Sequence, residues 1–140
     1  MKQHEYIQKL LADALRADGE LSDAGVTVLE QNSQDLAFMI EKEDSIIDAP
    51  VAVVTCDKAR KIHSAPPEWE LECSVMVTEA VPTNRTRGRY MTALDVAFLA
   101  ADLLDALEGV HLKDDVTHTT PGDGILQAEA KFACRVTINQ

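Results

Sequence analysis

The chain has 140 residues, of which 46% are hydrophobic and 26% charged, a composition and length typical of one globular domain over residues 1–140. Its formal net charge of −11 argues against a general phosphate-backbone binder, because affinity for nucleic acid comes mainly from Lys and Arg. No stretch approaches the roughly 18 consecutive apolar residues of a membrane span, and the polar N-terminus lacks the apolar core of a signal peptide. We therefore expect synthesis inside the cell and no membrane partner.

The first predicted element is an amphipathic helix over residues 4–17, where apolar residues recur at helical spacing. Gly19 is expected to end it. Residues 25–30 form a short run of β-prone residues and are predicted to be a strand. Residues 32–48 stay ambiguous, because their apolar positions fit both a helix and a strand.

Two strands with a basic connection are predicted next. Residues 51–56 form a continuous apolar run with β-branched side chains, which indicates a buried strand. Residues 57–67 are polar and close on two prolines, so we expect a basic connecting loop. Residues 68–81 alternate between apolar and polar side chains, which predicts a strand whose face carrying Trp69 meets the central helix.

The longest predicted helix covers residues 89–107 and is the centre of the expected fold. Its apolar residues form a broad arc, and a narrow stripe of acids completes the circumference. Three apolar residues flank that stripe: Met91, Phe98 and Leu99. Packing against one sheet would not cover all of this apolar surface, so we expect a second contact over it.

The C-terminal part is predicted to be β-structure. Residues 110–112 return the chain to the sheet, and residues 120–123 place Pro and Gly at the centre of a type II turn that would begin a hairpin. Residues 126–139 then alternate strictly. Together these elements predict an α+β fold, with a largely antiparallel sheet of about four to five strands packed by two main helices.

The sequence contains no motif for catalysis, nucleotide binding or metal binding. The three cysteines are widely spaced without a CxxC pair and are expected to be small buried residues in a reducing compartment. The polar residues His111, Asp114 and His118 could line a pocket, but their spacing is not that of a zinc site. We predict no catalytic residue, no metal and no cofactor.

Six of the thirteen cations lie in two short segments predicted to be loops. They are Lys58, Arg60, Lys61, Arg85, Arg87 and Arg89. Two interpretations stay open: the loops are solvated connections whose charges balance nearby acids, or they contact an acidic surface of a neighbouring subunit or passing DNA.

Several stretches together resemble a known family. They are an N-terminal amphipathic helix, the strand PVAVV, the strand WELECSVMV, a polar loop, the helix MTALDVAFLAADLLDAL and the final strand LQAEAKFACRVTIN. In order and length they resemble the tail terminator and tail-completion (neck) proteins of long-tailed bacteriophages. The resemblance covers nearly the whole chain and rests on element order, length and acidic charge.

The resemblance implies a non-enzymatic virion protein, made in the bacterial host cytoplasm, that forms a ring, commonly a hexamer. Such a ring caps the tail tube protein, presents a surface to the head connector protein, and lets DNA pass without sequence-specific binding. The residues expected at subunit or partner contacts are the six cations together with Met91, Phe98 and Leu99. The alternative is a small cytoplasmic oligomeric α+β enzyme or ligand-binding module with a pocket near His111, Asp114 and His118.

Overall fold

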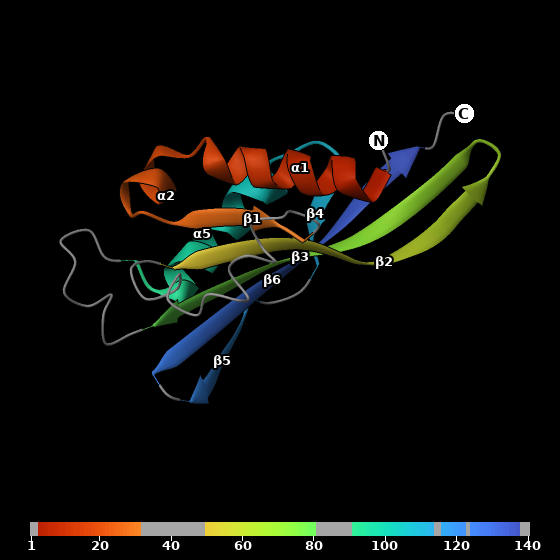
Figure 1. Cartoon of the computed structure of the whole chain (residues 1–140). Helices are drawn as coiled ribbons and strands as arrows, with labels where there is room; N and C mark the ends of the chain where they lie inside the picture. Colours follow the sequence, from red (N-terminus) through yellow and green to blue (C-terminus); the bar gives the residue numbers. More distant parts are fainter. Residues whose placement is uncertain (1–2, 32–49, 81–90, 114–115, 123, 138–140) are drawn as a thin grey trace.

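In the part of the chain that the structure describes, two main helices pack on one face of a six-stranded sheet (Figure 1). The computed structural model describes residues 3–31, 50–80, 91–113, 116–122 and 124–137. The two main helices are α1 (Gln3–Arg16) and α5 (Ala93–Asp105), and a short helix α2 (Gly19–Asp23) follows α1. This arrangement confirms the predicted α+β class with two main helices.

The sheet has the strand order β1-β2-β3-β6-β4, and β5 also pairs with β6. The strands are β1 (Thr27–Glu30), β2 (Val51–Ser64), β3 (Pro67–Ala80), β4 (Val110–Leu112), β5 (Thr117–Gly122) and β6 (Ile125–Thr137). Among the described strands, β1 and β2 are the one parallel pair, and the other pairs are antiparallel. The prediction of a largely antiparallel sheet is therefore confirmed.

The core lies between the helices and what we call the inner face of the sheet. The alternation predicted for the third and last strands holds here, since Leu71, Cys73, Val75 and Val77 of β3 and Phe132 of β6 are all buried. α5 packs against both strands, and α1 against β1 and β2. The prediction that the Trp69 face meets the central helix is confirmed, with Trp69 itself half-buried at the edge of the core. None of the described helices is long and apolar enough to span a membrane.

The predicted loop at residues 57–67 is wrong. β2 continues to Ser64 and forms a long hairpin with β3, in which cross-strand pairs such as Lys58 with Glu72 and Arg60 with Glu70 replace apolar packing. Two bulges, between Cys56 and Lys58 and between Lys61 and His63, break the two-residue period. A pattern search for strict alternation therefore misses the continuation. We call residues 57–70, the outer part of this hairpin, the arm; Figure 1 shows it extending beyond the helices.

Two further boundaries differ from the sequence prediction. The central helix begins at Ala93 instead of residue 89, because the Thr92 side chain accepts the Asp95 backbone N–H and Asp95 accepts that of Thr92. The predicted turn at residues 120–123 is misplaced, since β5 runs to Gly122, which pairs with Ile125. The ambiguous segment 32–48 lies outside the described residues.

Candidate functional site

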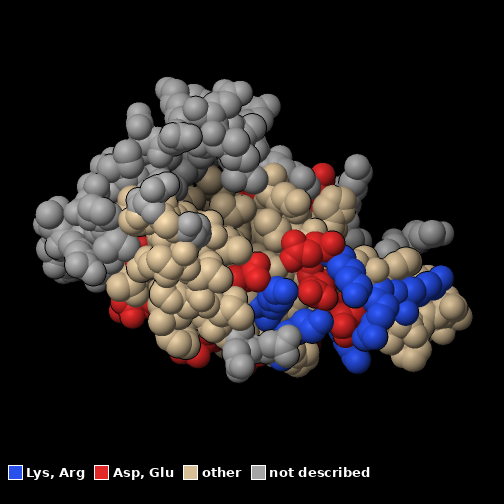
Figure 2. Space-filling view, turned by 90° about the horizontal axis from the view of Figure 1, so that it is seen from below, with Lys and Arg blue, Asp and Glu red and all other residues tan. Residues whose placement is uncertain are grey.

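The arm carries a concentration of exposed cations in an otherwise acidic chain. Lys58, Arg60 and Lys61 of β2 are all exposed, with 69% of the Arg60 side chain accessible. Figure 2 shows Lys and Arg side chains gathered at the hairpin end of the molecule, next to a group of acids. Three of the predicted contact residues are thus brought together, on a strand instead of the predicted loop.

These cations differ in how far their charge is compensated. Arg60 forms an ion pair with Glu70 at 3.3 Å, and the Lys61 amine lies 5.9 Å from the centroid of the Trp69 ring. Lys58 has no ion pair with any described residue. Exposed pairs of this kind contribute little to stability. The arm therefore keeps cations that can be used in a contact with another molecule.

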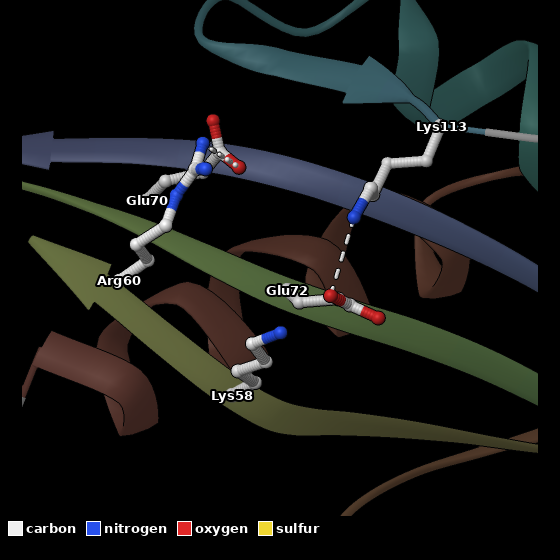
Figure 3. Close-up of a pocket in the computed structure, with 5 residues that line it drawn as sticks. All are labelled: Lys58, Arg60, Glu70, Glu72 and Lys113. Carbon is white, nitrogen blue, oxygen red and sulfur yellow. Dashed lines mark hydrogen bonds and ion pairs between the residues drawn. The ribbon is translucent and has the colours of Figure 1, made fainter. Parts of the chain in front are cut away.

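A shallow hollow of about 230 Å³ lies on the outer face of the sheet, which is the face turned away from the helices. Its five lining residues are Lys58, Arg60, Glu70, Glu72 and Lys113 (Figure 3). Glu72 is paired with Lys113 at 3.2 Å, and Figure 3 shows these charged side chains converging from β2, β3 and the end of β4. A hollow lined only by charged residues has none of the aliphatic or aromatic residues that predominate in small-molecule sites.

The exposed side of α5 carries the second group of predicted contact residues. Phe98 is 53% exposed, and Asp95 and Asp102, three residues before it and four after it, are exposed on the same stripe. Met91 and Leu99 are instead half-buried against the core. Of the three apolar residues predicted to be in surplus, Phe98 is the one that presents a large apolar surface to solvent.

The remaining predicted contact residues lie outside the described part of the chain. Arg85, Arg87 and Arg89 belong to residues 81–90, which the structure does not describe. Their place in any contact stays a prediction.

The histidines of the alternative pocket are not brought together. His111 pairs with Ala133 and His118 with Ala128, five positions apart along β6, or about 17 Å. An odd separation along a strand puts the two imidazoles on opposite faces of the sheet. Asp114 is not described. Among the described residues there is no group of three or more His, Cys, Asp or Glu that could hold a metal ion.

Sequence reasoning missed a pair of cysteines. Cys56 and Cys73 face each other across β2 and β3 with their sulfur atoms 3.2 Å apart, and both are free thiols. A hydrogen bond from Cys73 lowers the pKa of the Cys56 thiol, whereas hydrogen bonds to Cys134 and Cys56, together with burial, raise the pKa of Cys73. The hairpin register, which the sequence does not reveal, is what brings the two together.

Sequence reasoning also missed Glu79, a fully buried carboxylate near the end of β3. Its Oε1 accepts a hydrogen bond from the backbone N–H of Ala93, the first residue of α5. A signal for it exists in the sequence, because Glu79 falls on the apolar face of the alternating run that begins at residue 68. A carboxylate buried on that face needs a hydrogen-bond partner inside the protein.

Comparison with known proteins gives one clear result, and it concerns the fold. No family model and no curated protein matches the chain. The chain shares its fold with part of a virion. The match is to a chain in a solved structure described as "Virion of native gene transfer agent (GTA) particle", with a TM-score of 0.60 and 14% sequence identity. It covers 99% of this chain and 100% of the other.

Proposed function

We propose that this protein is a non-enzymatic structural protein of a phage-like virion, and that it acts as a tail terminator. In this role several copies form a ring, commonly a hexamer, that caps the finished tail tube and presents the surface to which the head is joined. The protein would be made in the bacterial cytoplasm and incorporated into the particle.

One observation carries the proposal: the end-to-end structural match to a chain of the gene transfer agent virion, with neither chain left over. A match of this extent includes the hairpin arm and both main helices, and not only a common core motif. At 14% identity it establishes the fold alone. The step from fold to virion role is our inference, and the order of elements in the sequence supports the same family.

The surfaces of the chain favour self-assembly over solution chemistry. Phe98 is a large aromatic side chain left half in solvent on a helix, a feature typical of interface centres. The exposed arm offers a second, charged surface at the hairpin end of the molecule (Figure 2). Two different surfaces that fit each other produce head-to-tail contacts, and such contacts close into a ring when the rotation permits.

The proposed partners follow from this role. The ring would contact the tail tube protein on one side and the head connector protein on the other, while DNA passes through the central hole. The net charge of −11 suits such passage, because an acidic protein does not hold the phosphate backbone. No sequence-specific DNA contact is needed for it.

Imaging of the purified protein tests the assembly part of this proposal. We expect closed rings with an open central hole by negative-stain electron microscopy, and a matching discrete mass by analytical ultracentrifugation. A chain that stays monomeric at high concentration would contradict the proposal. So would a compact dimer that holds a metabolite.

Loss of the gene from a particle-producing cell tests the terminator part. Without the protein, tail tubes should vary widely in length and carry no heads, and expression of the protein from a plasmid should restore both properties. Tails of normal length without heads would instead indicate a neck protein that joins the head after the tube is complete.

A further inference from the structure

We infer that the arm of one copy packs along the exposed stripe of α5 on the next copy, so that the two surfaces form one head-to-tail contact. The inference rests on the proposed function, since it names the surfaces through which the ring would close. The partner is therefore a second copy of this chain.

Charge complementarity is the first argument for this pairing. Every charged residue of α5 is acidic, and Glu108, just past its end, is also an exposed acid. The β2 strand of the arm, residues 57–64, carries three cations and the single acid Asp57, whereas Glu68 and Glu70 lie on its β3 strand. Complementary potentials orient two surfaces and exclude wrong pairings, and like charges placed together cost several kcal/mol. In a chain of net charge −11, the β2 strand of the arm is thus a basic segment, within the described residues, that complements the acidic helix.

The dimensions of the two surfaces also agree. From Asp95 to Asp105 the helix stripe is about 15 Å long, and the part of β2 beyond its first bulge, residues 57–64, can extend about 26 Å. Phe98 lies within the stripe and supplies apolar area. The cations occupy only Lys58 to Lys61, about 10 Å of that length, and Lys58 and Lys61 pair with Glu72 and Trp69, on opposite faces of the hairpin. Both can therefore reach the stripe only if the open edge of β2 faces it.

The edge of β2 along the arm is an independent reason to expect another molecule to pack against the arm. β1 pairs with β2 only from Val51 to Val54, and no other described strand pairs with β2 on that side. Within the described residues, the backbone N–H and C=O groups on that side of the outer part of β2 therefore face no partner strand. Lysines on such an edge can also serve only to prevent unwanted pairing, and the experiment below separates the two roles.

The contact must form between copies. Figure 1 places the tip of the arm at one end of the molecule and α5, which packs beside α1, toward the other end. One copy cannot close its own arm onto its own helix stripe. Each copy therefore offers one arm and one stripe, which generates a directional series of subunits.

The acidic residues of the stripe differ in the hydrogen bonds that they make. These bonds determine which acids can be substituted without disturbing the fold. Asp95 holds the start of α5 through Thr92, and the Asp105 carboxylate accepts the backbone N–H of Leu112 at 2.9 Å. The carboxylates of Asp102 and Glu108 make no hydrogen bond or ion pair with other described residues. These two acids can be replaced without removing a contact that supports the fold.

The test reverses charge on each surface separately and then combines the variants. The arm variant is Lys58→Glu/Lys61→Glu, the helix variant is Asp102→Lys/Glu108→Lys, and the control is Lys9→Glu on the exposed side of α1. Self-association is measured by sedimentation, and folding by circular dichroism. We expect each double variant alone to associate at least about tenfold more weakly than the unmodified chain, and the control to associate normally.

An equal mixture of the two double variants is the decisive sample. The acidic arm of one fits the basic stripe of the other, and the unchanged arm and stripe also fit, so the mixture should assemble again. Normal rings from the arm variant alone, or no recovery in the mixture, would overturn the arm-to-helix contact while leaving the ring itself intact. Absence of assembly by the unmodified chain would overturn both the contact and the proposed function.

Discussion

Glu79 accepts a hydrogen bond of 2.7 Å from the backbone N–H of Ala93, and this bond joins the end of β3 to the start of α5. The first N–H groups of a helix have no partner within the helix, and negative charge is favourable near them. Glu79 is fully buried, so water does not compete for the bond. The bond therefore holds the N-terminal end of α5, where its exposed stripe begins, against the sheet.

Removing this acceptor should destabilise the fold. We expect Glu79→Ala to lower the free energy of unfolding by about 2 kcal/mol, because a buried backbone donor loses its hydrogen-bond partner. Glu79→Gln keeps an acceptor oxygen in place and should cost less. Urea unfolding of both variants, with the exposed Glu108→Ala as control, measures the difference. Equal stability of the alanine variant and the unmodified chain would contradict this role.

Thr92 should matter in a similar but smaller way. Its hydroxyl accepts the backbone N–H of Asp95 at 3.0 Å, and Asp95 returns the bond to the backbone of Thr92. Replacement of such a capping residue by Ala costs about 1 kcal/mol. Thr92→Ser keeps the hydroxyl and should retain most of the stability in the same urea measurement. A loss in the serine variant as large as in the alanine variant would point to packing of the methyl group instead.

The parts of the fold that the sequence predicted are those with an unbroken period. Both main helices and the alternating strands β3 and β6 were predicted because their buried faces repeat regularly, as from Leu71 to Val77. The outer half of β2 was missed because two bulges interrupt its alternation and charged cross-strand pairs replace apolar ones. Local sequence carries no information about the partner strand that stabilises it.

The candidate site was predictable only in part for the same reason. Charge counting alone singled out Lys58, Arg60 and Lys61, and helical periodicity singled out Phe98. Neither method could show that the cations and the helix stripe lie toward different ends of one molecule. That arrangement depends on the long-range pairing of β2 with β3, and the head-to-tail contact follows from it.

Two residues of α5 should separate folding from assembly. Leu104 is fully buried, so Leu104→Ala should cost about 2–5 kcal/mol of stability. Phe98 is 53% exposed, so Phe98→Ala should change stability by less than about 0.5 kcal/mol but weaken self-association. Urea unfolding and sedimentation of each variant measure both effects. Unchanged association of the Phe98 variant would remove this side chain from the proposed interface.

The three thiols should react with alkylating reagents in a fixed order. Cys56 is half-buried and its pKa is lowered by a hydrogen bond from Cys73, so it holds more thiolate near neutral pH than an ordinary cysteine. Cys73 and Cys134 are buried, and the pKa of Cys73 is raised by hydrogen bonds to its neighbouring thiols and by burial. Iodoacetamide should therefore modify one thiol of the folded chain and all three of the unfolded chain.

The pH dependence of the alkylation rate tests the direction in which the pKa of Cys56 is shifted. The rate for Cys56 should rise with pH and reach half of its maximum at a lower pH than the rate for the unfolded chain, because a lowered pKa releases the proton earlier. Cys56→Ser should abolish the reaction of the folded protein, as followed by intact mass. Rapid labelling of Cys73 in that variant would show that β2 opens away from β3 in solution, since Cys73 is reached only when the hairpin separates.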